Sequence, residues 1–316
     1  MSKLVSIGEV LIDFQSVGTG SLKHIQQFIK NAGGAPANVC VQAAKLGQKA
    51  IYLTQVGDDG FGEFLIEELQ NTGVDTSYIK KSKQYHTSLA FVSYKEDGER
   101  EFSFYRANAA DLYFTKEDFK EVTFEQGDIL EFGSVALKTE ASREVHLDLI
   151  QRARQKDALI CFDPNIRLNL WENHKELKEV ILEYITYADI IKLSEDELFY
   201  LTDTNQIEEG MKQFKHQDKI FLITLGSAGA ILYRNGCRIE VKGFKVKAVD
   251  TTGAGDSFFG GLISMLLKKG SQAKNLTLQE YQPMVEFACK CGAYTTTGFG
   301  AMKAMGNEKE IESVGK

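Results

Sequence analysis

The chain has 316 residues, of which 43% are hydrophobic and 26% charged, so it has enough apolar material for a large buried core. Its formal net charge is −7 and it has no basic stripe, which argues against nucleic acid and anionic membranes as partners. The first residues are too short an apolar run for a secretion signal or a membrane span, so we expect a cytoplasmic protein. Its five cysteines lie among apolar neighbours and are typical of reduced core thiols.

Strands and helices are predicted to alternate over the first seventy or so residues. Apolar runs predict strands at Lys3–Gly8 and Ile51–Gln55, and helical patterns occupy Val39–Leu46 and Glu63–Asn71. This order is typical of a parallel sheet with helices on both faces. The polar stretch Phe14–Lys30 lacks a helical period, and we expect strand and loop there.

The alternation is interrupted by two β-rich runs, His86–Tyr94 and Arg100–Arg106, which are joined through Lys95–Glu99. The Asp-Gly pair in this connection is a strong hairpin signal. Because an antiparallel hairpin inserted in such a chain must leave the main sheet, we expect residues 86–106 and 14–30 to form a small β lid over the core. The exposed edges and aromatic side chains of this lid predict a homodimer in which two lids pair.

The strand and helix order resumes after the hairpin and continues to the last hundred residues. No internal repeat or linker is visible, so residues 1–316 are predicted to form one domain with a three-layer α/β/α fold, a mostly parallel sheet and the small β lid. The remaining elements are expected as strands at 128–132, 158–162, 190–193 and 221–225, a β segment at 231–244, and helices at 139–155, 172–187, 257–269 and 278–297.

The most informative stretch is Asp250-Thr251-Thr252-Gly253-Ala254-Gly255-Asp256-Ser257, which directly precedes an apolar helical run. A turn of small residues that starts a helix leaves backbone N–H groups at the positive end of the helix, which makes an anion site. A carboxylate fits such a site if Asp256 accepts a proton while the amides stabilise charge on a transferring phosphoryl group. From this stretch alone, Asp256 or Ser257 could equally be a helix N-cap.

A second glycine-rich turn, Asn31–Asn38, leads into the first predicted helix. Its paired glycines permit another group to approach the backbone closely, and Asn38 in the first helical turn would face the same space as the helix N-terminus. A plain strand-to-helix turn is the alternative. The chain contains no Gly-x-x-x-x-Gly-Lys-Ser/Thr sequence, which excludes a Walker-type phosphate loop.

These two stretches resemble the two signatures of the ribokinase-like (PfkB-type) carbohydrate kinases. Three further segments follow in the family's order, so that the resemblance covers nearly the full chain: 57–62, 162–167 and 224–226. Within the family the chain is most similar to bacterial fructokinases, through the Gly-Ala-Pro-Ala-Asn form of the first signature and through Phe104-Tyr105-Arg106 followed by Ala110-Asp111-Leu112.

The resemblance implies an ATP-dependent fructokinase that converts D-fructose to D-fructose 6-phosphate. Ala35, after the paired glycines, favours an uncharged sugar over one already phosphorylated. A kinase for 2-keto-3-deoxygluconate or another keto sugar is the alternative within the family. Outside it, two classes stay open: a sugar-sensing binding protein without catalysis and a dinucleotide-dependent oxidoreductase.

The resemblance also implies roles for single residues. Asp256 is expected to take the proton of the sugar hydroxyl, with the amides of Gly253, Ala254 and Gly255 facing the γ-phosphoryl group and Arg167 nearby. An exposed salt bridge is the alternative for Arg167, as it is for Arg106. The expected sugar site comprises Asp13, Gly33, Gly34, Asn38, Phe104 and Arg106 besides Asp256. The expected nucleotide site comprises Lys192, Ser194, Glu197, Thr224, Gly226, Gly229, Gly253, Gly255 and Cys289.

Two cations are implied by the same resemblance. Mg²⁺ is expected at Glu197, through water, beside the triphosphate. A monovalent cation, K⁺ in this interpretation, is expected beside Asp250 and Thr252, with carbonyl groups from residues 297–300.

Overall fold

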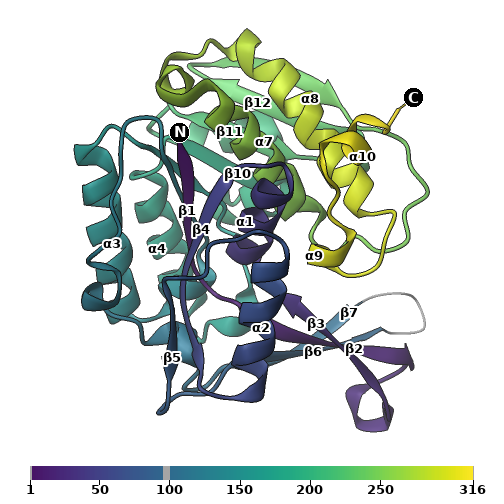
Figure 1. Ribbon diagram of the computed structural model, residues 1–316. Coiled ribbons are helices and arrows are strands. Elements are labelled where there is room, and N and C mark those ends of the chain that lie inside the picture. The colour runs from purple at the N-terminus through teal and green to yellow at the C-terminus, as the bar shows by residue number, and fades with distance from the viewer. Residues whose placement is uncertain (1, 95–99, 316) are drawn as a thin grey trace.

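The computed structural model describes residues 2–94 and 100–315 and is organised around a nine-stranded sheet (Figure 1). The order of its strands is β13-β12-β11-β10-β9-β8-β1-β4-β5. The run from β5 to β11 is parallel, and β12 and β13 extend one edge in antiparallel pairing. The strands are β1 (Lys3–Ile7), β4 (Lys49–Gly57), β5 (Ile79–Ser82), β8 (Ile129–Phe132), β9 (Leu159–Phe162), β10 (Ile190–Ser194), β11 (Ile220–Thr224), β12 (Gly229–Arg234) and β13 (Cys237–Lys242).

Helices cover both faces of this sheet, because the side chains of its buried strands are apolar on both faces. In β1, Leu4 packs into the core shared with α1, α2, α7 and α8, whereas Val5 and Ile7 pack into the core shared with α3, α4 and α5. The helices are α1 (Ala35–Lys45), α2 (Gly60–Asn71), α3 (Glu140–Gln155), α4 (His174–Ile185), α5 (Glu195–Thr202), α6 (Ile207–Gln213), α7 (Ala254–Lys269), α8 (Leu278–Thr295), α9 (Ala301–Ala304) and α10 (Glu308–Glu312).

A separate four-stranded sheet lies at one end of the main sheet, below α9 in Figure 1. It consists of β3 (Phe28–Gly33), β2 (Leu11–Thr19), β6 (Ser88–Tyr94) and β7 (Arg100–Tyr105), in that order. One face packs on α2 through aromatic rings, since Phe14 lies between Phe91 at 5.0 Å and Phe61 of α2 at 5.6 Å. The predicted departure of the hairpin from the main sheet is confirmed. The turn predicted at residues 95–99 lies outside the described residues.

The predicted three-layer fold is confirmed, with corrections to single elements. The β segment expected at 231–244 is two antiparallel strands, β12 and β13, because Asn235 and Gly236 both adopt positive φ (52° and 75°) and make a tight turn between them. The strand β5 and the helices α5, α6, α9 and α10 were not predicted. Four cysteines are buried as expected, but Cys237 is exposed at the start of the edge strand β13.

Within the described residues, no helix is both long and apolar enough to cross a membrane.

We expect His146 to make the stability of this fold depend on pH. The imidazole is 1% exposed in α3, beside Phe114 and Phe132, and burial lowers its pKa to about 4 although the carbonyl of Ser142 lies 2.8 Å from Nδ1. The unfolded chain, with a histidine pKa near 6.5, therefore binds the proton more tightly than the folded one. The stabilisation is complete above about pH 6.5 and is lost as the pH falls towards 4, by up to about 3 kcal/mol.

Urea unfolding at pH 7.5 and pH 5 tests this expectation. Wild type should lose about 2 kcal/mol more than His146→Leu between the two pH values. Using the difference removes the contribution of the carboxylates that titrate in both proteins. Equal losses in the two proteins would show that His146 does not titrate in this range.

Candidate active site

The candidate active site is a cavity of about 330 Å³ between the carboxyl ends of the main parallel strands and the small sheet. Most of the predicted site residues line it. They are Asp13, Gly34, Asn38, Phe104, Arg167, Lys192, Ser194, Glu197, Thr224, Thr252, Gly253, Gly255 and Asp256. The remaining ones do not line it: Gly33, Arg106, Gly226, Gly229, Asp250, Ala254 and Cys289.

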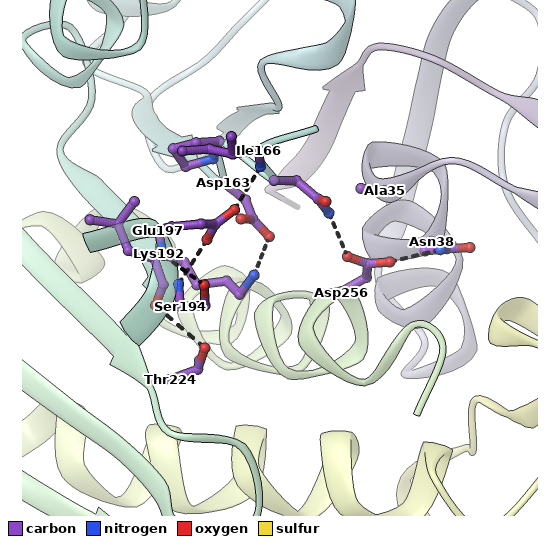
Figure 2. Close-up of polar contacts among 12 residues, drawn as sticks. Ala35, Asn38, Asp163, Ile166, Lys192, Ser194, Glu197, Thr224 and Asp256 are labelled. Carbon is purple, nitrogen blue, oxygen red and sulfur yellow. Dashed lines mark hydrogen bonds and ion pairs between the residues drawn. The ribbon is translucent and has the colours of Figure 1, made fainter. Parts of the chain in front are cut away.

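Asp256 lies in the first turn of α7 and is 8% exposed. Its two carboxylate oxygens accept hydrogen bonds from opposite sides, from Nδ2 of Asn38 at 2.7 Å and from Nδ2 of Asn165 at 3.2 Å; Figure 2 shows the carboxylate pointing at Asn38. Burial raises the pKa of Asp256, while Lys192, the Asn38 hydrogen bond and Arg167 oppose the rise. The carboxylate is thus held in one orientation and has an increased affinity for a proton.

The N-terminus of α7 opens onto the same cavity. Gly253 precedes the helix with φ +77°, a conformation that favours glycine, and both Gly253 and Gly255 line the cavity. The first amides of a helix have no partners within it, so they and the helix dipole attract an anion here. A proton acceptor and an anion site therefore lie in one helical turn.

Lys192 places a positive charge beside this turn. A Cβ atom on Gly255 would lie 3.2 Å from the lysine Nζ, so the ammonium group reaches the first turn of α7. Nζ also contacts Asp163 Oδ2 at 2.6 Å, as Figure 2 shows, and both side chains are almost fully buried. Burial alone would lower the pKa of Lys192, but the nearby carboxylates Asp163, Glu197 and Asp256 outweigh burial and raise it.

Glu197 holds the loop that carries Asn165 and Arg167. Its Oε1 accepts from the backbone N–H of Ile166 at 2.6 Å, and its Oε2 accepts from that of Ser194 at 2.8 Å (Figure 2). The Ser194 hydroxyl accepts from the Glu197 amide in return, which completes a capping box at the start of α5. Both oxygens of Glu197 are thus engaged by backbone amides, so a cation could be reached through water without breaking these bonds.

The sugar side of the cavity is formed by β2 and the turn before α1. Gly34 has φ +116°, and a Cβ atom there would overlap the carbonyl oxygen of Glu9, so the close approach requires glycine. The constraint on Gly33 is weaker, because a Cβ atom there would overlap only the end of the Asp13 side chain, which can move aside. Burial raises the pKa of Asp13 to about 7, with Arg167 opposing this rise and Asp256 and Asp250 adding to it.

Comparison with known proteins identifies the family to which these features belong. Residues 1–308 match the family model described as pfkB family carbohydrate kinase. The chain belongs to the pfkB family. Fructokinase-1 from Zea mays is 39% identical over 314 residues, which cover 98% of this chain and 96% of that protein.

Solved structures of pfkB family members agree in fold with the whole chain. Fructokinase from Vibrio cholerae O395, bound to fructose, ADP and calcium ion, has a TM-score of 0.90 and 32% identity, covering 100% of this chain and 99% of its own. A double mutant of that enzyme, bound to fructose, ADP and potassium ion, has a TM-score of 0.89 and 31% identity over the same shares. Fructokinase from Xylella fastidiosa with bound ATP has a TM-score of 0.86 and 31% identity, covering 98% of this chain and 97% of its own.

Two residues on the sugar side were not predicted from the pfkB signatures. Asn165 bonds Asp256, and Glu9, 3% exposed, lines the cavity and accepts from the Ala35 amide at 3.2 Å. Burial raises the pKa of Glu9 to about 7, with Arg106 opposing and Asp111 adding. Polar residues at the ends of β1 and β9 were the available signal, but their partners come from distant segments.

Asp250 joins the two loops at which the monovalent cation is expected in this pfkB kinase. Its Oδ1 accepts from the Thr252 amide at 3.0 Å and hydroxyl at 2.6 Å, and its Oδ2 accepts from the Gly300 amide at 3.2 Å. The Asp250 carboxylate therefore holds the loop at Thr252 against the loop at Gly300. Carbonyl groups of these loops would be the oxygen ligands of a cation.

The other predicted residues outside the cavity lie in three different places. Gly226 and Gly229 flank the short turn between β11 and β12, and Cys289 is buried in α8. Their nucleotide contacts stay predictions. Arg106 forms a buried ion pair with Asp111, which rules out its alternative of an exposed salt bridge, and its contact with the sugar stays a prediction.

Proposed function

We propose that this pfkB family kinase transfers the terminal phosphoryl group of ATP to D-fructose, giving D-fructose 6-phosphate and ADP. The observation that carries the proposal is the Asp256 carboxylate, fixed by Asn38 and Asn165 at the anion-binding N-terminus of α7. Relatives named fructokinase that match over nearly the whole chain, at 31 to 39% identity, support the choice of sugar.

In this mechanism the fructose 6-hydroxyl oxygen attacks the γ-phosphorus. A new O–P bond forms, the bond between the γ-phosphorus and the bridging oxygen breaks with its electron pair going to ADP, and Asp256 takes the hydroxyl proton. The amides at Gly253 and Gly255 stabilise the charge on the moving phosphoryl group, and Lys192 supplies a positive charge beside them. The Ala254 amide donates to the Thr251 carbonyl at 3.3 Å, so it would join them only if that bond opened. Arg167 lowers the pKa of Asp256 against burial and so favours the ionised base.

The charges of the cavity favour a neutral sugar over a sugar acid. Its wall carries three acidic side chains on the sugar side, Glu9, Asp13 and Asp256, against one arginine, Arg167. The positive charge of Arg106, which a sugar carboxylate would need, is already paired with Asp111. A 2-keto-3-deoxygluconate kinase is therefore the less favoured interpretation, since its substrate would meet like charge at close range.

We propose further that the enzyme uses Mg²⁺ and K⁺. Mg²⁺ would be held through water by Glu197 near Ser194 and Thr224, and when bound it would neutralise phosphate charge. K⁺ would lie beside Asp250 and Thr252, against the carbonyls of residues 297–300. The calcium and potassium ions named for the bound forms of the Vibrio cholerae structures support the use of metal ions by this kind of kinase. Gly226, Gly229 and Cys289 would border the nucleotide.

We also propose that residues 1–316 act as one domain in the cytoplasm, with the small sheet as a lid and two lids paired in a homodimer. The support is the edge strand β7 and exposed apolar side chains on this sheet, Tyr105 at 65% and Ile29 at 56%. Light scattering at micromolar concentration measures the mass directly, and a monomer there would contradict the pairing.

A coupled assay of ADP release tests the function. With MgATP and KCl, fructose should be turned over with a kcat/KM at least about tenfold higher than 2-keto-3-deoxygluconate, ribose or adenosine, because each loses hydrogen bonds or meets like charge. EDTA should abolish turnover, and replacing K⁺ by a large organic cation should reduce it. Sugar binding without ADP release would favour the sensing protein, and affinity for NAD(P) would favour the oxidoreductase.

A further inference from the structure

A buried polar cluster that the proposed reaction does not use lies where β6 begins and β7 ends, next to the main body. Arg106 Nη2 is paired with Asp111 Oδ2, Arg106 Nε donates to Ser88 Oγ at 3.2 Å, and Ser88 Oγ donates to Asp111 Oδ1 at 2.5 Å. Arg106 is 7% exposed, and Ser88 and Asp111 are each 1% exposed. The three side chains thus form a closed ring of hydrogen bonds with hardly any access to water.

The cluster joins the small sheet to the main body. Ser88 is the first residue of β6, and Arg106 directly follows β7, so the cluster ties together the roots of both lid strands. Asp111 lies in a short helical turn whose Ala110 carbonyl accepts from Gln55 Nε2 of the main strand β4 at 3.1 Å. One buried ion pair therefore fixes the lid strands against the main sheet.

Strand β7 also carries the aromatic wall of the sugar cavity. Phe102 and Phe104 are two residues apart in β7 and so lie on the same face, where both line the cavity and stack on each other with ring centroids 5.9 Å apart. Phe104 is two residues before Arg106, so a shift of the ion pair would move the ring. The charges of the cluster also act on the cavity wall, because Arg106 lowers the pKa of Glu9 there and Asp111 raises it.

We propose that Arg106 is a positioning residue, which acts through Asp111 and Ser88 to hold Phe102 and Phe104 of the lid against the sugar and does not touch the substrate itself. The inference rests on the proposed sugar kinase function. Loss of the cluster should loosen the sugar site and leave the proposed nucleotide site around Lys192, Ser194 and Thr224 as it is. Fructose binding should weaken, and water admitted under the lid should increase ATP hydrolysis without sugar transfer.

The test compares three variants, Arg106→Met, Asp111→Asn and Ser88→Ala, by KM for fructose, KM for ATP and the ratio of ATP hydrolysed to fructose phosphorylated. Arg106→Met and Asp111→Asn should raise the fructose KM by a similar factor, about 10- to 100-fold, with the ATP KM within about twofold of wild type. Ser88→Ala keeps both charges and should give a smaller rise in the same direction. All three should increase the uncoupled share of ATP hydrolysis.

Three results would overturn the proposal. A large effect of Arg106→Met with wild-type kinetics for Asp111→Asn would mean that Arg106 contacts the sugar directly. Equal losses for fructose and ATP would mean that the cluster only stabilises the fold. If the two charge variants do not fold, Ser88→Ala with a wild-type melting temperature and an unchanged fructose KM would also overturn it.

The outcome is separable from that of the proposed function. The variants are compared with wild type on whichever sugar of the panel wild type phosphorylates, so failure of fructose as the substrate leaves the comparison intact. Glu101→Gln serves as the matched control, because Glu101 is exposed on the same strand and lies next to Phe102, on the other face of β7. It should keep the wild-type KM for sugar.

Discussion

Asp256→Ala is expected to lower kcat by about 10²- to 10⁴-fold, which is the usual contribution of a positioned proton acceptor. Asn38 and Asn165 both donate hydrogen bonds to this carboxylate. It lies on the cavity wall at the N-terminus of α7. Removing it leaves the anion-binding amides and Lys192 in place, so ATP and sugar should still bind. Single-turnover kinetics, together with calorimetric titration of ATP and fructose, separate the loss of chemistry from a loss of binding.

Asp196→Asn is the matched control for this variant. Asp196 is an exposed carboxylate in the first turn of α5, close in sequence to the nucleotide segment but outside the cavity wall. It should keep the wild-type kcat. An Asp256→Ala enzyme with more than a tenth of the wild-type kcat would mean that another group takes the proton, and a ternary crystal structure with the terminal phosphorus far from this carboxylate would reject the assignment altogether.

The parts of the fold that the sequence predicted are those with a long apolar period. The helices α3, α4, α7 and α8 and the buried parallel strands have continuous apolar patterns, and each was expected near its observed bounds. The strand β5 was missed because its sequence Ile-Lys-Lys-Ser carries the charges of a sheet edge and not the pattern of a buried strand. The helix α5 was missed although Ser194 and Glu197 have the spacing of a capping box.

The candidate site was predictable where one short segment contains all the residues that act together. The N-terminus of α7 is such a segment, since the glycines and Asp256 lie within one turn. Asn165 and Glu9 were missed because their roles depend on segments far away in the chain. Arg106 and Asp111 were both noticed as part of one motif, but only the three-dimensional arrangement shows that they neutralise each other.

Lys192→Met should lower both the stability and the activity of the enzyme, for separable reasons. The lysine is the ion-pair partner of buried Asp163, whose other oxygen has no hydrogen-bond partner among the described residues. Breaking a buried pair on one side costs about 3–5 kcal/mol of unfolding free energy near neutral pH. The loss of a charge beside the transferring phosphoryl group should lower kcat by about 10²- to 10³-fold.

The pH dependence of this stability loss has a definite sign. Burial raises the pKa of Asp163 in the folded protein above its value in the unfolded chain, and removing Lys192 takes away the main charge that opposes this rise. Since the pKa of Asp163 is already raised to about 7 in wild type, both proteins lose stability alike up to that pH, and the extra loss of the variant should grow as the pH increases above about 7. Urea unfolding of wild type and variant at pH 5 and pH 8 measures the trend, and a loss that shrinks with increasing pH would contradict it.

The double variant Asp163→Asn/Lys192→Met separates the two effects. Without the buried carboxylate no uncompensated charge is left, so most of the lost unfolding free energy should return. The kcat should stay low, because the positive charge at the first turn of α7 is still missing. If the double variant instead recovered wild-type kcat, Lys192 would contribute to the reaction only by balancing Asp163, and the charge that stabilises the phosphoryl group would have to come from the helix amides, Arg167 and the bound cation.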